Sequence, residues 1–266
     1  MKRILGVATL FVGIAGFGST AAGQEFAKAR LEKSPRHHEW VKISAGDRIV
    51  QTFVAFPEVP KPVPAVIVIH ENRGLTDWAK LAADEFAEAG YVALAPDLLS
   101  GMGPDGGGTD ALGQGAMKAL YGLKPEQITT DLNAVFEYAK GLPACNKKVA
   151  VGGFCWGGGQ TFRFATNQPG LAAALVFYGP APDAAALERI KCPVYGFYGG
   201  NDARINAGIA AAEKAMKAHG KKYEPVVYDG AGHGFMRAGD EPTAEGANKQ
   251  ARDEAWVRIK AVLAKL

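Results

Sequence analysis

The sequence predicts an α/β fold, in which a mostly parallel, doubly wound sheet carries helices on both faces within a single domain. Short, continuous apolar runs recur along the chain, which is typical of strands that are buried on both faces of a sheet. Amphipathic stretches of helical length separate these runs, and regular alternation of the two indicates parallel strands joined by crossover helices. Because no internal repeat, low-complexity tract or linker interrupts the pattern, we expect one domain after an amino-terminal leader.

The first 23 residues differ in composition from the rest of the chain. Two basic residues, Lys2 and Arg3, precede an apolar run at 4–17 and a stretch of small residues that ends at Gly23. This order is typical of a secretory signal, with Ala21 and Gly23 at the positions that a signal peptidase recognises. We therefore predict a signal peptide at 1–23, a domain at 24–266, and export to the periplasm or the medium. An uncleaved anchor is the weaker alternative because the run is short for a transmembrane helix, and the lack of a following cysteine disfavours lipoprotein attachment.

The net charge of the mature chain bears on its possible partners. Removing Lys2 and Arg3 with the signal leaves 28 of the 30 basic residues against 27 acidic ones, so the mature chain is nearly neutral. Bulk charge therefore gives no reason to expect binding to nucleic acid or to a membrane surface. We expect no stable membrane insertion once the signal is removed, and a monomer or weak dimer.

Three cysteines in an exported chain suggest one pair and one free thiol. Cys145 and Cys192 both precede apolar runs and are candidates for the pair. If one strand lies between the strands that follow Cys145 and Cys192, those two strands are about 9 to 10 Å apart. A disulfide needs the two Cα atoms within about 7 Å. The sequence therefore does not favour a bridge, and it leaves Cys155 as the free thiol.

The strands and helices follow in order along the chain. After a polar stretch at 24–36, expected to be a short helix or a loose arm, apolar patterning predicts strands at 41–44, 49–56, 65–69, 91–95, 148–151, 172–178, 194–198 and 223–228. Helical periodicity predicts helices at 75–89, 125–140, 184–190, 206–219 and 243–266. The glycine-rich segment 101–115 has no basic residue, and we interpret it as a flexible connection in preference to an active-site lid.

A strand, a tight turn and a helix are centred on Cys155. Gly153 and Gly157 flank it at two positions on either side, and their missing Cβ atoms allow a sharp reversal that exposes the central residue. In that position a cysteine can act as a nucleophile once it is a thiolate. The alternative is a glycine-rich turn that carries an inert, buried cysteine. A phosphate-binding loop is disfavoured because bulky residues fill the turn and neither glycine fingerprint occurs.

Other chemistry-bearing residues directly follow predicted strands. Glu71, Asp202 and His233 join Cys155 in loops at the carboxyl ends of strands, where open parallel sheets bind their ligands. Taken singly, Asp202 is also explained as a turn or helix cap and His233 as a solvated loop residue. Together, the order of cysteine, aspartate and histidine favours a catalytic triad with Cys155 as nucleophile, His233 as base and Asp202 as the group that orients the imidazole.

The motifs Gly-Phe-Cys-Trp-Gly-Gly, Gly-Gly-Asn-Asp, Gly-Ala-Gly-His-Gly-Phe and His-Glu-Asn-Arg-Gly resemble those of the dienelactone hydrolase family from about residue 40 to the carboxyl end. The resemblance implies the α/β-hydrolase fold and cleavage of an ester or lactone through a thiol acyl-enzyme. Backbone N–H groups of Trp156 and Asn72 are the expected oxyanion donors. The resemblance further implies that Glu71 interacts with the catalytic cysteine and with Arg237; we expect substrate to draw Arg237 away and free Glu71 to help ionise the thiol. A purely structural ion pair is the alternative.

The sequence departs from the family pattern at one place. Dienelactone enzymes carry an arginine near an Asp-Leu-Tyr sequence to hold the substrate carboxylate, whereas this chain has Asp97-Leu98-Leu99-Ser100-Gly101. Dienelactone itself is therefore in doubt as the substrate, and Arg73 is a candidate substitute.

Several functional alternatives remain open. A thioesterase or an acyl-peptide hydrolase would use the same triad, and a non-catalytic exported binding protein would keep only the fold. We expect a small-molecule ester or lactone as the substrate, and no cofactor. Metal dependence is disfavoured because His37 and His38 are adjacent and lack a second ligand pair.

Overall fold

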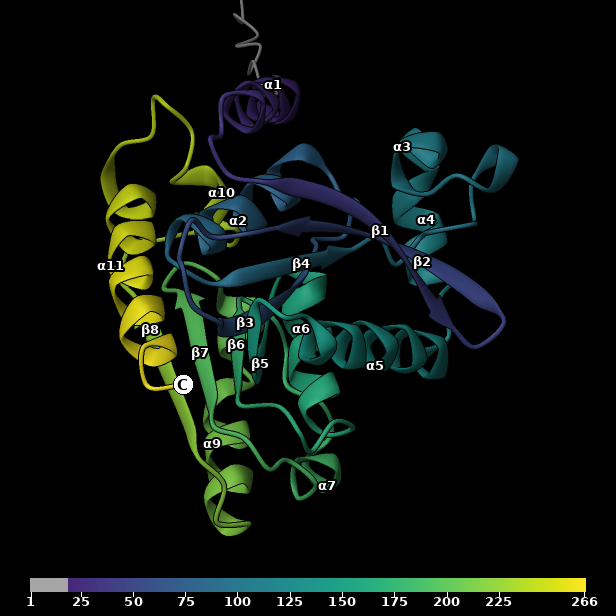
Figure 1. Ribbon diagram of the computed structural model, residues 1–266. Coiled ribbons are helices and arrows are strands. Elements are labelled where there is room, and N and C mark those ends of the chain that lie inside the picture. The colour runs from purple at the N-terminus through teal and green to yellow at the C-terminus, as the bar shows by residue number, and fades with distance from the viewer. Residues whose placement is uncertain (1–18) are drawn as a thin grey trace, which may run out of the picture.

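An eight-stranded sheet forms the centre of the computed structural model, which describes residues 19–266 (Figure 1). Its spatial order is β1-β2-β4-β3-β5-β6-β7-β8. The strands are β1 (His38–Ala45), β2 (Arg48–Ala55), β3 (Val63–Ile69), β4 (Val92–Pro96), β5 (Cys145–Phe154), β6 (Ala173–Phe177), β7 (Val194–Gly199) and β8 (Tyr223–Tyr228). β2 pairs antiparallel with both β1 and β4, and every other pairing is parallel. The predicted α/β fold with a mostly parallel sheet is confirmed.

Helices cover both faces of this sheet. The longer ones are α1 (Ser19–Glu32), α2 (Asp77–Glu88), α5 (Pro125–Gly141), α6 (Trp156–Ala165), α9 (Ile209–Ala218) and α11 (Gly246–Leu263). Figure 1 shows α11 and α5 on opposite sides of the strands. Residues of α1, α2 and α11 join one buried cluster, whereas α5, α6 and α9 contribute to the other.

The strand sequences explain the two clusters. Side chains alternate between the faces of a strand, so a strand covered on both sides must be apolar throughout. In β3, Val66 and Val68 enter the cluster beneath α2, while Ile67 and Ile69 enter the cluster beneath α5 and α6. All four side chains are fully buried.

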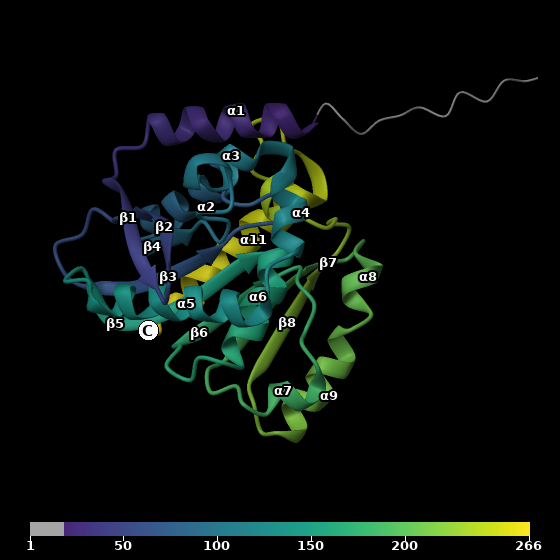
Figure 2. The same cartoon turned by 90° about the vertical axis from the view of Figure 1, so that its right-hand side faces the viewer.

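The amino-terminal helix is fixed to the body of the protein by an ionic cluster whose two carboxylates are buried. Arg30 of α1 ion-pairs with Glu85 of α2 and with Asp240, and Arg252 of α11 pairs with the same two carboxylates. The pKa of Glu85 is raised to about 7, mainly by burial and next by the nearby charge of Asp240. The two arginines act in the opposite direction and lower it. Figure 2 shows α1 on the outer side of α2, so that α2 lies between α1 and the sheet. The segment is therefore a docked helix and not a loose arm.

The predicted signal peptide stays a prediction. Residues 1–18 lie outside the described residues, and α1 already begins at Ser19, so the expected cut after Gly23 falls within this helix. Among residues 19–266, no helix combines the length and apolar character needed to cross a bilayer.

The glycine-rich segment differs from the flexible connection that the sequence suggested. It contains short helical turns at η1 (Pro104–Gly106), α3 (Thr109–Leu112) and η2 (Gly113–Gly115), followed by α4 (Ala116–Tyr121), which was not predicted. Buried Asp97 fastens the segment, because its two carboxylate oxygens accept from the Thr109 N–H and hydroxyl, each at 2.7 Å. Bonds from Asp97, 12 residues before Thr109, thus help to order a stretch whose composition is typical of a loop.

The three cysteines are all free thiols. Cys145 begins β5 and Cys192 precedes β7, with β6 between those strands. Burial raises the pKa of both thiols, that of Cys192 to about 12, so both side chains are neutral. The disfavoured disulfide is not formed.

Candidate active site

Cys155 occupies the turn between β5 and α6 in a strained conformation. Its φ of 56° and ψ of −114° lie where residues with a side chain are rarely found. The flanking glycines are required by close contacts of the backbone: a Cβ on Gly153 would lie 2.4 Å from the Gly157 carbonyl oxygen, and a Cβ on Gly157 would lie 2.4 Å from the carbonyl oxygen of His70. The tight packing of this turn holds Cys155 in this conformation, with its side chain partly buried.

Cys155, His233 and Asp202 form one hydrogen-bonded chain. His233 Nε2 lies 3.2 Å from Cys155 Sγ, and His233 Nδ1 lies 2.5 Å from Asp202 Oδ2. The three residues follow β5, β7 and β8 at the carboxyl end of the sheet. The structure therefore brings together the three side chains that the sequence selected.

Asp202 serves two neighbours at once. Its Oδ1 accepts from the Ile205 N–H at 3.4 Å as the N-cap of α8 (Ala203–Asn206), while Oδ2 faces His233. The carboxylate is almost completely buried. The sequence offered helix capping and contact with the histidine as alternatives, and both are present. The capping bond fixes the carboxylate, and the fixed carboxylate orients the imidazole ring.

The surroundings of His233 favour its protonated form. The pKa of His233 is raised from 6.5 to about 9. The largest cause is its hydrogen bond with Cys155; burial opposes the shift, and the hydrogen bond with Asp202 adds to it. An imidazolium next to a sulfur atom stabilises the thiolate form of that sulfur. The arrangement can thus hold a proton on His233 while Cys155 acts as a nucleophile.

Glu71 and Arg237 form an ion pair beside this chain. Arg237 Nε, in α10 (Phe235–Ala238), donates to Glu71 Oε2 at 3.0 Å, and both side chains are partly exposed. The pair joins the loop after β3 to the segment that carries His233. The predicted proximity of these two residues is present in the structure.

His70 is a residue of the site to which the sequence analysis gave no role. It is fully buried, and burial lowers its pKa, so the ring is neutral. Its Nδ1–H donates to the Glu71 carbonyl at 2.8 Å, and its ring stacks on Trp156 at 5.7 Å between centroids. The signal for this role was its place directly after a buried strand. His70 orients both the loop that carries Glu71 and the residue after Cys155.

Two backbone N–H groups in the loops after β3 and β5 are free. Trp156 is the first residue of α6, so its N–H has no acceptor within the helix. Across residues 19–266, neither this N–H nor that of Asn72 has a hydrogen-bond partner. These are the two groups predicted to face an oxyanion.

Comparison with known proteins gives the family. Residues 50–266 match the dienelactone hydrolase family. The chain belongs to this family. A Saccharolobus solfataricus protein named "Putative carboxymethylenebutenolidase" is 32% identical over 80% of this chain and 93% of its own length, and a protein of the same name from Methylorubrum extorquens is 33% identical over 73% and 71%. The crystal structure of a "Putative Dienelactone Hydrolase" from Klebsiella pneumoniae covers 87% of this chain and 99% of its own, with a TM-score of 0.76 and 25% identity.

This member of the dienelactone hydrolase family is therefore a carboxymethylenebutenolidase-like hydrolase with an α/β-hydrolase fold. It has a cavity of about 730 Å³ between the loop after β3 and the segment that holds α3 and α4. Arg73 lines that cavity together with Asp110 and Met117. Ala116, another lining residue, belongs to a small apolar cluster against which Trp156, the residue after Cys155, also packs.

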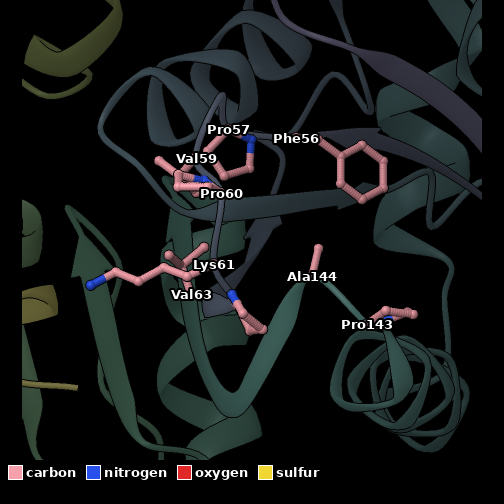
Figure 3. A pocket seen from close by; sticks show the side chains of 9 residues that line it. Phe56, Pro57, Val59, Pro60, Lys61, Val63, Pro143 and Ala144 are labelled. Atoms are coloured by element: carbon pink, nitrogen blue, oxygen red, sulfur yellow. The ribbon is translucent and has the colours of Figure 1, made fainter.

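A second hollow lies at the opposite end of the sheet, where β3 and β5 begin. Figure 3 shows Val59, Pro60 and Lys61 on one side of it, and Pro143 and Ala144 on the other. None of the candidate site residues lines it. In the described part of this family member, no group of three or more His, Cys, Asp or Glu residues is arranged to hold a metal ion.

Proposed function

We propose that the protein hydrolyses a carboxylic ester or lactone with Cys155 as nucleophile, His233 as general base and Asp202 as the residue that orients His233. The observation that carries this proposal is the unbroken chain of contacts from Sγ through the imidazole to a buried carboxylate. Membership of a hydrolase family supports the reaction class.

The reaction proceeds in two halves. In the first, His233 holds the thiol proton while the thiolate attacks the ester carbonyl; the carbon–sulfur bond forms, the ester carbon–oxygen bond breaks, and the proton goes to the leaving oxygen. In the second half, His233 takes a proton from water, the hydroxide attacks the thioester, and the thiolate is released with the acid. The raised pKa of His233 suits the proton-holding step.

Charge on the carbonyl oxygen would be stabilised by the backbone N–H groups of Trp156 and Asn72. Both are free in the described chain and belong to segments that are fixed, one by the start of α6 and one by the His70 contacts. Donors that are already oriented need no reorganisation as charge develops, which makes them effective.

The Glu71–Arg237 pair would control ionisation of the thiol. An anionic or strongly polar substrate that contacts Arg237 would weaken its 3.0 Å bond to Glu71, and the released carboxylate would then help to remove the Cys155 proton. Partial exposure of both side chains supports this proposal, since substrate can reach them.

Arg73 would select among substrates. Leu98 and Leu99, where the family's substrate-binding arginine is expected, are fully buried and carry no charge. Arg73 is exposed, lines the cavity between the loop after β3 and α4, and has no ion-pair partner in residues 19–266. An ester that carries a carboxylate away from its scissile bond would suit this site better than a compact lactone.

The protein would act outside the cytoplasm, with residues 1–23 directing its export. Cell fractionation of a tagged chain tests this: the tag should appear in the periplasm or medium on a shortened protein, and full-length protein in the cytoplasm would contradict it.

A substrate panel tests the proposed chemistry. Purified protein and its Cys155→Ala variant are assayed on activated esters, lactones and thioesters, with Cys145→Ala as a matched control because Cys145 is buried away from His233. We expect turnover by the wild type and the control and none by Cys155→Ala. A thioester preference would identify the alternative substrate class, and full activity of Cys155→Ala would end the proposal.

A further inference from the structure

Tyr178 lies beneath the proposed catalytic histidine. It directly follows β6 at the carboxyl end of the sheet and is fully buried. Its ring stands edge-on to the His233 ring, with 5.1 Å between centroids and 61° between planes, and it contacts Phe235 in the same way. Tyr178 is therefore in direct ring contact with the proposed base from the buried side of the site.

The backbone of Tyr178 is held in an uncommon conformation. Its φ of 41° lies in the left-handed region, which is a genuine outlier for a bulky residue. The Tyr178 N–H donates to the Phe197 carbonyl at 2.8 Å, and the next residue, Gly179, packs so tightly on α6 that a Cβ there would lie 2.2 Å from the Gly158 carbonyl carbon. Strain of this kind persists where the surroundings impose it, often at functional sites.

The Tyr178 hydroxyl has no hydrogen-bond partner among residues 19–266, although it is buried. A buried hydroxyl without a partner destabilises the folded state, so its presence needs an explanation. The charged groups that act on it belong to the active site. The pKa of Tyr178 is raised well above 10, mainly by burial and next by the negative charge of Glu71. Cys155 raises it further, whereas the positive charge of Arg237 lowers it. The hydroxyl therefore keeps its proton.

We infer, on the basis of the hydrolase function proposed above, that the Tyr178 hydroxyl is a third hydrogen-bond donor of the active site and donates to an oxygen of the tetrahedral intermediate on Cys155. The free enzyme leaves this donor unpaired, and the reacting ester supplies its acceptor. Because the acceptor gains negative charge as the intermediate forms, the bond strengthens in the transition state and lowers the barrier to reaction.

The Tyr178→Phe variant tests the inference, because it removes the hydroxyl and keeps the ring contacts with His233 and Phe235. We expect kcat for an activated aryl acetate to fall about 10- to 100-fold with little change in KM, as for loss of a donor to a charged group. The midpoint of thermal unfolding should stay the same or rise, since a buried unpaired hydroxyl is removed. The rate of Cys155 alkylation by iodoacetamide should not change, because that reaction forms no tetrahedral oxyanion.

Tyr228→Phe is the matched control. Tyr228 is also buried and its ring lies 5.2 Å from that of Phe235, but Arg258 and Glu254 are the charged groups that act on its hydroxyl. The control should keep the kcat of the wild type.

Three results would overturn the inference while leaving the hydrolase intact. They are full kcat in Tyr178→Phe, a fall in alkylation parallel to the fall in kcat, and a loss of activity that matches a loss of folded protein. If the wild type itself shows no Cys155-dependent turnover, the proposed function fails first and the inference with it, and this is seen before any tyrosine variant is measured.

Discussion

Replacing Asp202 by asparagine should lower the pKa of His233 and so weaken its hold on a proton. Asparagine keeps an oxygen to cap the Ile205 N–H, so α8 should remain intact, but the negative charge 2.5 Å from Nδ1 is lost. The pKa of His233 should then fall from about 9 toward 6.5. Turnover should drop by roughly 10²- to 10⁴-fold, because the ring loses its fixed tautomer and orientation.

The structure also gives the size of the effect on folding stability. The difference between 6.5 and about 9 corresponds to about 3 kcal/mol at ~1.36 kcal/mol per pKa unit. The ring is 33% exposed, and screening reduces this to about 2 kcal/mol. Because the bond to Cys155 is the larger cause, we assign about 1 kcal/mol to Asp202.

The sign of the pH dependence follows from the direction of the shift. A pKa raised on folding contributes stability that is complete below pH 6.5 and is lost as pH rises through about 9. Urea denaturation of the wild type and of Asp202→Asn should therefore show a gap of about 1 kcal/mol at pH 6 that closes near pH 10. A gap that is the same at both values of pH, or an unchanged His233 titration by NMR, would refute the reasoning.

Four further predictions follow from the same contacts. Gly157→Ala should unfold at lower denaturant and lose turnover, because its Cβ would lie 2.4 Å from the His70 carbonyl oxygen; a stable, active variant would contradict the packing of the turn. Only Cys155 should react quickly with a thiol reagent in the native protein, and all three cysteines after unfolding; two fast thiols would argue against the burial of the others. Glu71→Gln should slow acylation sharply with no change in unfolding, and unchanged kinetics would reject its role. Arg73→Ala should raise KM about 10-fold for esters that carry a carboxylate and not for neutral ones; equal effects on both would remove Arg73 from substrate selection.

The fold was predictable because its signal is repeated along the chain. Each central parallel strand needs apolar residues on both faces, and each helix needs one apolar stripe. The alternation of strands and helices can therefore be recognised from short stretches of sequence. The same logic located Cys155, Asp202 and His233, since each lies in a loop that follows a strand. The strand before His233, β8, is an edge strand that is only partly buried.

The rest depends on contacts between residues that are distant in sequence. The docking of α1 rests on Arg30 and Asp240, which are 210 positions apart. Segment 101–121 is ordered by side-chain contacts, the bonds of Asp97 to Thr109 and the packing of Ala116 and Leu120 on Leu99, and not by the propensity of a glycine-rich stretch. Tyr178 was overlooked because an aromatic residue that ends an apolar run reads as core, and only its strained φ and unpaired hydroxyl distinguish it.

Direct capture of the acyl-enzyme tests the central claim that Cys155 forms a covalent bond to the substrate. Acid quenching within the first turnover of an activated aryl acetate, followed by mass spectrometry of the peptides, should show one acetyl group as a thioester on Cys155. No acetyl group should be found on the Cys155→Ala variant. An enzyme that turns over rapidly and carries its acetyl group on another residue, or carries none under conditions that trap thioesters, would contradict the account.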